Sequence, residues 1–268
     1  GLAGLVLERS ALGATLPTAT RAELERFAAR TAFENVHALR QVSPVIQALD
    51  RAGISVMLLK GAALLTTIYD RPDLRPMSDV DLLVRPEDAV RSVAIMQSVG
   101  CRRGSALIRE DFFPRFHYEV ELFIPGPHPV RLDLHARPFR PMRWSRIIPD
   151  DALWVGAITV DVHGTRAFVP RPELFLVQLA GHAAFHGCSR LLWLYDLVRL
   201  VRTYGNALDW ELVLRRCEEW RLGAAVELAL RMAKNLLGPF VPTDVLLRMS
   251  SQRTNWRDRL VLRQTPRD

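Results

Sequence analysis

Two aspartates stand two positions apart in the apolar segment 79–84. If this segment is a β-strand, the side chains of Asp79 and Asp81 point to the same face, roughly 6.5 to 7 Å apart. Val80 and Leu82 then occupy the opposite face, where a core can bury them. The spacing therefore predicts two carboxylates that are directed at one place from an otherwise apolar strand.

A second acidic strand is predicted at 130–135, where Asp133 lies on the polar face. If the two strands are neighbours, Asp133 completes a cluster of three carboxylates with Asp79 and Asp81. Such a cluster repels itself unless cations are bound, because like charges raise one another's pKa. Mg²⁺ prefers oxygen ligands and keeps part of its shell for substrate phosphates. We therefore expect all three aspartates to be catalytic residues and metal ligands, holding two Mg²⁺ ions for an in-line phosphoryl or nucleotidyl transfer.

A glycine turn after the apolar run 54–59 predicts the phosphate-binding half of the same site. Gly61 allows a ligand to approach the backbone closely, and the free N–H groups of a helix that begins at about Ala62 can bind phosphate. Lys60 adds a positive charge and is one of only two lysines in the chain. The turn and the acidic strands together predict a site for a metal-bound nucleoside triphosphate (NTP).

Hydrophobic periodicity indicates the elements that precede this site. Apolar residues that include Phe27 and Phe33 recur at helical spacing after a capping box at 20–23. Pro44 interrupts the pattern, because proline lacks the N–H group that a helix interior needs. We therefore expect a break or kink near Val42, followed by a second short helix that ends around Gly53.

The remaining chain first alternates between predicted strands and helices and then becomes helical. The pattern over 54–100 is strand, helix, strand, helix, and two strand pairs follow, 118–124 with 130–135 and 157–162 with 166–169. Four segments with helical spacing come after these. We expect N-terminal helices at 1–53, a domain with a mixed sheet that carries the site at 54–169, and a helical domain at 170–268.

The composition is that of a globular protein. Hydrophobic residues make up 49% of the chain and charged residues 24%, which excludes a disordered or collagen-like chain. No uncharged apolar run reaches the ~20 residues of a membrane span. The net charge is +7, but all but two of the 36 basic residues are arginines and no basic run of five occurs, so nucleic acid is not a favoured partner.

Metal sites other than the carboxylate cluster are not expected. Three widely spaced cysteines without a CxxC pair predict neither a disulfide framework nor a cysteine zinc site. His182 and His186 share a helix face, but no glutamate lies between them, and we expect packed histidines. Since the segment 1–7 does not resemble a secretory signal either, we expect a cytoplasmic protein.

The motifs around the site resemble the polymerase-beta-like nucleotidyltransferase superfamily, whose core combines a Gly-Ser turn with an Asp-x-Asp strand and a later aspartate. More narrowly, they resemble a family of uncharacterised bacterial nucleotidyltransferases often found beside genes for peptide natural products. That family has an L-K-G turn, here 59–61, and an R-P-M-S-D-V-D-L-L-V segment, here 75–84, followed by a D-L-H strand and a helix similar to 192–197. The resemblance covers roughly 54–238. It implies an α+β fold with a mixed sheet, preceded by N-terminal helices and followed by a helical domain, with 54–169 as the catalytic domain.

The resemblance also implies an activity. The protein would transfer a nucleoside monophosphate (NMP) from an NTP to an acceptor, with Mg²⁺, and release pyrophosphate. Asp79 and Asp81 would bind the metal ions, and Asp133 would complete the second metal site and accept the proton of the acceptor hydroxyl. The residues expected to bind the nucleotide are Lys60, Gly61, Ala62, Arg75 and Ser78.

Two features depart from the superfamily pattern and leave alternatives open. Ala62 replaces the usual serine, so phosphate contacts must come from backbone amides, Lys60 or Arg75. The interval between Gly61 and Asp79 is also longer than usual. Two alternatives on the same fold are a module that senses nucleotides or binds a partner without turnover, and a toxin-like transferase that acts on RNA. The acceptor, whether small molecule, peptide, protein hydroxyl or RNA end, the base of the NTP and the oligomeric state are not predicted.

Each candidate residue also has an explanation without chemistry. The two aspartates of 79–84 would form the polar face of a solvent-exposed strand. Asp133 would pair with Arg131 or His135 on its own strand, and Lys60 would be a solvated loop cation. The joint occurrence of the acidic strand, the glycine turn and Asp133 favours the functional interpretation.

Overall fold

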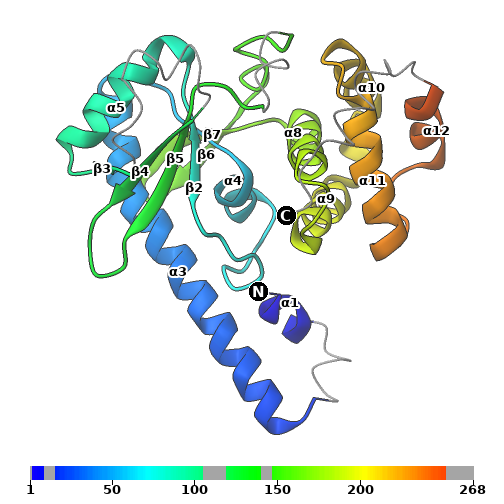
Figure 1. Cartoon of the computed structure of the whole chain (residues 1–268), viewed down its shortest axis with the longest axis horizontal. Helices are drawn as coiled ribbons and strands as arrows, with labels where there is room; N and C mark the ends of the chain where they lie inside the picture. Colours follow the sequence, from blue (N-terminus) through cyan, green and yellow to red (C-terminus); the bar gives the residue numbers. More distant parts are fainter. Residues whose placement is uncertain (1, 9–15, 105–118, 140–146, 252–268) are drawn as a thin grey trace. The chain divides into compact units, whose positions relative to one another are not determined.

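The computed structural model describes residues 2–8, 16–104, 119–139 and 147–251 (Figure 1). The chain divides into two compact units. One unit comprises Gly1–Arg137 and Ile158–Val169, and the other comprises Pro138–Ala157 and Pro170–Asp268. The first unit contains the sheet and all of the candidate site residues.

Seven strands of the described residues form one mixed sheet in the order β3-β4-β5-β2-β1-β7-β6. The pairs β2/β5 and β1/β7 are parallel and the other pairs are antiparallel. The predicted α+β fold with a mixed sheet is confirmed. The strands are β1 (Met57–Leu58), β2 (Val80–Leu83), β3 (Arg102–Arg103), β4 (Glu119–Ile124), β5 (Val130–His135), β6 (Ile158–Val162) and β7 (Thr165–Val169).

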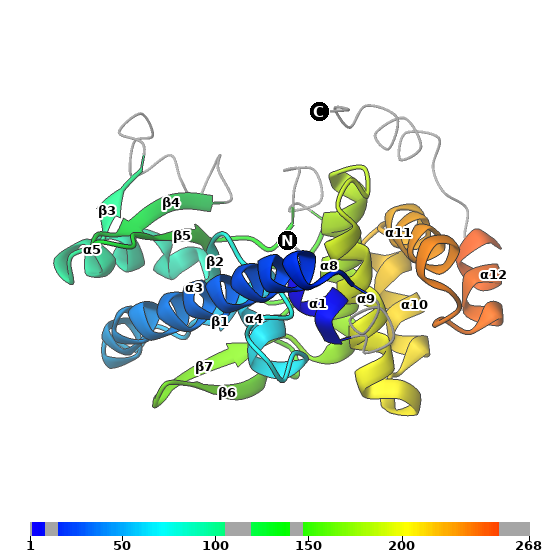
Figure 2. The ribbon, with the colours of Figure 1, turned by 90° about the horizontal axis from the view of Figure 1, so that it is seen from below.

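The helix α3 (Thr18–Arg51) runs unbroken along the sheet, and Figure 2 shows its length. One helix spans Thr18–Arg51 with Pro44 inside it, so a break near Val42 with a separate second helix is wrong. Pro44 is exposed, whereas Val42 and Ile46 are buried. The proline ring and the backbone bond that it removes therefore face solvent, and burial of the opposite side holds the helix together.

The N-terminal half of α3 has the predicted helical spacing, but two of its aromatic residues lie at the surface. Phe27 and Phe33 are both 52% exposed, whereas Ala28 is buried. The other helices of the first unit are α1 (Ala3–Glu8), α4 (Lys60–Thr67), a 3₁₀ turn η1 (Pro86–Asp88) and α5 (Ala89–Ser98).

The second unit is helical, as predicted. The helix α8 carries apolar residues on all sides and is almost entirely buried among its neighbours α9, α10 and α11, the pattern of a central helix. The rings of His182 and His186 pack against Trp193 with centroids 4.8 and 5.3 Å away. No helix within the described residues is long and apolar enough to cross a membrane. The helices are α8 (Pro172–Phe185), α9 (Leu191–Tyr204), η2 (Gly205–Ala207), α10 (Trp210–Glu219), α11 (Gly223–Leu237) and α12 (Thr243–Ser251).

Candidate functional site

The strands β2 and β5 are neighbours, and their parallel register places Asp81 directly beside Asp133. The alternation of β2 buries Val80 and Leu82 completely on the other face. Asp79 precedes β2 by one residue and continues the polar face of Asp81. The condition for a three-carboxylate cluster, adjacent acidic strands, is therefore met.

Asp81 is buried, with 2% of its surface exposed, and holds two partners on one oxygen. Lys60 Nζ lies 2.6 Å and His135 Nε2 lies 2.7 Å from Oδ1 of Asp81. Burial by itself would raise the pKa of the Asp81 carboxyl, but the Lys60 charge and the His135 hydrogen bond outweigh it and hold that pKa well below its ordinary value. Asp81 is therefore a carboxylate at neutral pH, and the ammonium group of Lys60 balances its charge.

The turn between β1 and α4 explains why Lys60 reaches Asp81. The N–H group of Leu59 donates to the backbone carbonyl of Asp81 at 3.0 Å, which fixes the turn against β2. Lys60 then adopts φ = 43°, a left-handed conformation that is rare for residues other than glycine. Backbone strain of this kind is concentrated at functional sites. The chain thus pays a conformational cost at the residue that holds Asp81.

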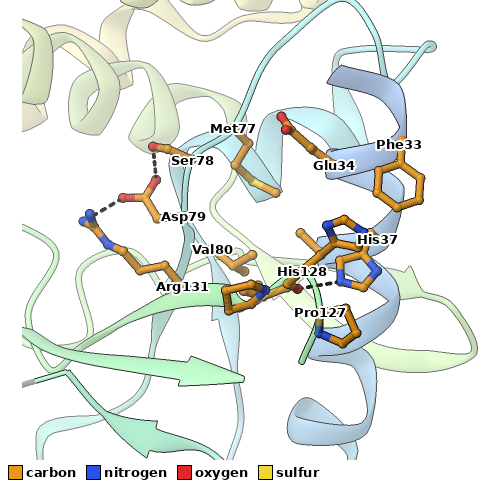
Figure 3. Close-up of a pocket in the computed structure, with 13 residues that line it drawn as sticks. Phe33, Glu34, His37, Met77, Ser78, Asp79, Val80, Pro127, His128 and Arg131 are labelled. Atoms are coloured by element: carbon orange, nitrogen blue, oxygen red, sulfur yellow. Dashed lines mark hydrogen bonds and ion pairs between the residues drawn. The ribbon is translucent and has the colours of Figure 1, made fainter. Parts of the chain in front are cut away.

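Arg131 binds the other two aspartates. Its Nη2 lies 3.1 Å from Asp79 Oδ2 and 2.9 Å from Asp133 Oδ2, and its Nε lies 3.2 Å from Glu121 on β4. Ser78 Oγ donates to Asp79 Oδ1 at 3.1 Å (Figure 3). Arg131 therefore bridges the two outer carboxylates, whereas Lys60 balances the charge of the inner one and His135 hydrogen-bonds to it.

Asp79 is the least compensated carboxylate of the three. Burial raises its pKa, and the nearby charges of Asp81 and Asp133 raise it further, against the opposing charges of Lys60 and Arg131. A carboxylate that the protein does not fully neutralise is a favourable ligand for an added cation. Asp79 thus retains the self-repulsion that was expected of the whole cluster.

Arg75 covers the first turn of α4. A Cβ atom on Gly61 would lie 2.3 Å from Arg75 Nη1, so glycine is required for the guanidinium to lie where it does. Arg75 is 6% exposed, and Asn35 on α3 donates to its backbone carbonyl at 2.8 Å. Ala62 is fully buried, which leaves only its backbone N–H for a ligand. The turn therefore presents a buried guanidinium beside Gly61.

Sequence reasoning did not assign His135 and Glu119 to the site. His135 is 3% exposed, and its Nδ1 lies 3.6 Å from Glu119 Oε2 on β4. Burial raises the pKa of Glu119. The signal was present, since Arg131, Asp133 and His135 alternate along β5, but the pairing of β4 with β5 was needed to bring Glu119 to the same face.

The donor chemistry of the cluster fits hard divalent cations, because two in-register carboxylates and a third beside them offer six oxygens. The side-chain positions do not yet form such a site. Among the described residues, no three histidine, cysteine, aspartate or glutamate side chains are arranged to bind a metal ion. Lys60 forms an ion pair with Asp81, and Arg131 forms ion pairs with Asp79 and Asp133. A metal ion on the same oxygens would have to displace these protein cations.

A pocket of about 340 Å³ adjoins the cluster (Figure 3). Its wall nearest the cluster includes Ser78, Asp79 and Arg131, and its far wall comes from α3 and from the turn between β4 and β5. The far wall carries the side chains of Phe33, Glu34, His37, Pro127 and His128. None of these was predicted as a site residue, because α3 and the turn are far apart in the sequence and form a pocket only in the folded protein.

Comparison with protein families gives a match over most of the chain. A family profile described as an uncharacterised nucleotidyltransferase matches residues 1–238. No curated protein matches the chain significantly. Among solved structures, an antigenic nucleotidyltransferase-like protein from Paracoccidioides brasiliensis is 15% identical over 71% of this chain and 93% of its own, with a TM-score of 0.43. The antibiotic-resistance factor ANT(2'')-Ia is 14% identical over 76% of this chain and 96% of its own, with a TM-score of 0.46.

Proposed function

Because the chain belongs to the family of uncharacterised nucleotidyltransferases, we propose that it transfers an NMP from an NTP to the hydroxyl group of an acceptor and releases pyrophosphate. The observation that carries this proposal is the in-register placement of Asp81 and Asp133, with Asp79 beside them. When bound, Mg²⁺ would neutralise the phosphates and align the attacking and leaving oxygens. The reaction is proposed to occur in the cytoplasm, because the buried Cys101, Cys188 and Cys217 are all free thiols.

Asp79 and Asp81 bind the metal ions in this proposal, with Asp133 as the third ligand. A divalent ion on the Asp81 carboxylate would take over the charge balance that Lys60 now provides, and Lys60, at the start of α4, would then be available for the outer phosphates. The 2.6 Å pair between Lys60 and Asp81 would be the metal-free state of this site.

The triphosphate is proposed to lie on the first turn of α4. The backbone N–H groups of Gly61 and Ala62 point at it, because the first turn of a helix has no internal partners for them. The buried guanidinium of Arg75 beside Gly61 replaces the missing serine hydroxyl. Ser78 lies near the α-phosphate through its hydrogen bond to Asp79.

The transfer step conserves atoms and charge. The acceptor hydroxyl oxygen bonds to the α-phosphorus as the bond from that phosphorus to the pyrophosphate oxygen breaks. The hydroxyl proton passes to Asp133, which is 6% exposed and lies in register with Asp81. Arg131, which holds Asp133 at 2.9 Å, must turn toward Asp79 or the substrate for this to happen.

Labelled NTPs test the reaction type. The protein is incubated with Mg²⁺, cell extract and each of the four NTPs, labelled either on the α- or on the γ-phosphate. NMP transfer puts α-label but no γ-label into an acceptor, and the size class of the labelled material separates small molecule, protein and RNA. Transfer of γ-label would replace this proposal with phosphoryl transfer.

A second candidate is a module that binds nucleotide without turnover. The observations in its favour are Ala62 at the usual serine position and the contacts of Lys60 and His135 with the same oxygen of Asp81. It predicts nucleotide binding without label transfer in any extract. A toxin-like transferase acting on RNA would instead place the α-label in RNA.

A further inference from the structure

The pocket beside Asp79 has an aromatic wall, defined here as Phe33, His37 and His128. The rings of Phe33 and His37 are nearly parallel, at 13° with centroids 5.8 Å apart, and His128 meets Phe33 edge-on at 5.3 Å. His37 Nε2 lies 2.9 Å from the backbone carbonyl of His128, so the wall joins α3 to the turn before β5. Figure 3 shows these side chains facing the pocket from the side opposite Asp79.

The aromatic wall is accessible to solvent, although large apolar side chains such as phenylalanine are usually buried. Phe33 remains 52% exposed. Exposed apolar surface that lines a cavity next to charged groups is typical of a ligand-binding site. Pro127 and Pro129 flank His128 and restrict the backbone of the turn. The wall is thus preorganised, and its rings can stack on a planar ligand at low entropic cost.

Sheet order indicates which substrate enters here. The helix α4, which is proposed to hold the triphosphate, follows β1, and β1 and β5 flank β2 on opposite sides. The pocket is built from the starts of β2 and β5. Along the strand order, the proposed phosphate site therefore lies on the β1 side of Asp79, and the pocket lies on its β5 side. In an in-line displacement, the attacking oxygen enters opposite the leaving pyrophosphate.

We propose that the pocket binds the acceptor, and that the acceptor carries an aromatic ring, as a tyrosine side chain does. This assignment rests on the proposed nucleotidyl transfer. The ring stacks on the aromatic wall and directs its hydroxyl toward Asp79, which lines the pocket and shares Arg131 with Asp133. The hydroxyl oxygen then bonds to the α-phosphorus, pyrophosphate leaves, and the proton passes to Asp133.

Two binding measurements on the full chain test this assignment. The first follows N-acetyl-tyrosinamide by ligand-observed NMR, in the presence of Mg²⁺ and the α,β-methylene analogue of each NTP, which does not react. The second measures the affinity for the Mg²⁺-bound analogue by calorimetry. The variants are Phe33→Ala and His128→Ala, which act on the wall from two different elements. Phe27→Ala is the matched control, because Phe27 is on the same helix, is equally exposed and does not line the pocket.

We expect Phe33→Ala and His128→Ala to weaken tyrosinamide binding about tenfold, the scale of a lost aromatic stacking contact. Neither variant should change the affinity for the nucleotide analogue by more than about twofold, and Phe27→Ala should change neither affinity. If Phe33→Ala weakens the nucleotide analogue instead, the pocket holds the base and the assignment is overturned. If the wild type binds the analogue but no tyrosinamide, the assignment fails and the proposed function stands. If the wild type does not bind any Mg²⁺-bound analogue, the proposed function fails, and the acceptor role of the pocket fails with it.

Discussion

The ammonium group of Lys60 lies 2.6 Å from the carboxylate of Asp81, and both groups belong to the proposed nucleotide site. The side-chain exposures are 21% for Lys60 and 3% for Asp81. A protein cation thus holds the position that a metal ion takes in the proposed reaction. The ion pair stabilises Asp81 in the absence of metal. Substitutions at different carboxylates should therefore change the free energy of unfolding in opposite directions.

Removal of charge at Asp81 and at Asp79 should have opposite effects on stability in the absence of metal. Asp81→Asn leaves Lys60 without its carboxylate, and we expect a loss of about 1 to 3 kcal/mol in the free energy of unfolding. Asp79→Asn removes the least compensated carboxylate, whose raised pKa means that its charge opposes folding at pH 7. It should leave stability unchanged or raise it.

Denaturant unfolding in EDTA at pH 7 measures both values. Asp50→Asn is the control, because Asp50 pairs with Arg166 at the surface and should contribute less than about 1 kcal/mol. Equal destabilisation by Asp79→Asn and Asp81→Asn would show that both carboxylates are structural ion pairs of the same kind.

The acid limb of the stability curve should depend on Asp81. The folded-state pKa of this group lies below its ordinary value of 3.8, so its stabilising contribution is complete above that value and is lost as the pH falls through the folded-state pKa. The free energy of unfolding of the wild type should therefore fall more steeply below about pH 4 than that of Asp81→Asn. Parallel acid limbs would mean that Asp81 is not held as a carboxylate by Lys60 and His135.

Lys60→Gln should change metal and nucleotide affinity in opposite directions. Without nucleotide, Mn²⁺ no longer competes with an ammonium group at Asp81, and its affinity should rise by roughly tenfold. The affinity for an NTP with Mg²⁺ should fall, and more than the affinity for an NMP, because Lys60 is proposed to contact the outer phosphates. Paramagnetic titration with Mn²⁺ and calorimetry with nucleotide provide the two values.

Lys234→Gln is the matched control, since Lys234 is the other lysine of the chain and lies on α11. Both affinities should stay at their wild-type values in this variant. A lower Mn²⁺ affinity in Lys60→Gln would contradict the proposal that Lys60 and the metal ion compete for Asp81.

Gly61→Ala and Arg75→Ala should act through one contact. The added methyl group displaces the Arg75 guanidinium from the first turn of α4, where it would lie 2.3 Å away. Each variant should therefore weaken NTP binding, and the double variant should be no weaker than Arg75→Ala alone. Additive losses in a double-mutant cycle would mean that Arg75 does not serve the nucleotide through its place at Gly61.

The sequence predicted the parts of the site that follow from local periodicity. Alternation along 79–84 and 130–135 predicted which aspartates share a face, and the glycine after an apolar run predicted the start of α4 within two residues. These features depend on one strand or one turn at a time. The assignment of metal and nucleotide roles to these residues stays a prediction.

What the sequence did not predict depends on contacts between distant segments. The partners of the carboxylates are the clearest example, since Lys60 and Arg131 reach Asp81 and Asp79 across 21 and 52 positions. The helix propensity of proline predicts a break or kink at Pro44, but it contains no information about which side of α3 packs on the sheet. Phe33 was assigned to a helix stripe, and its place in the pocket wall became visible only with the turn before β5.

Calorimetric titration with a non-reacting α,β-methylene NTP analogue tests the central claim, the metal-bridged nucleotide site on Asp81, most directly. The wild type should bind the analogue with Mg²⁺ and lose roughly a hundredfold in affinity in EDTA, because phosphate and carboxylate oxygens share the ions. Asp81→Asn should bind equally weakly with Mg²⁺ and in EDTA. Wild-type binding that is equally tight in EDTA, or Mg²⁺-dependent binding that survives Asp81→Asn, would contradict the account.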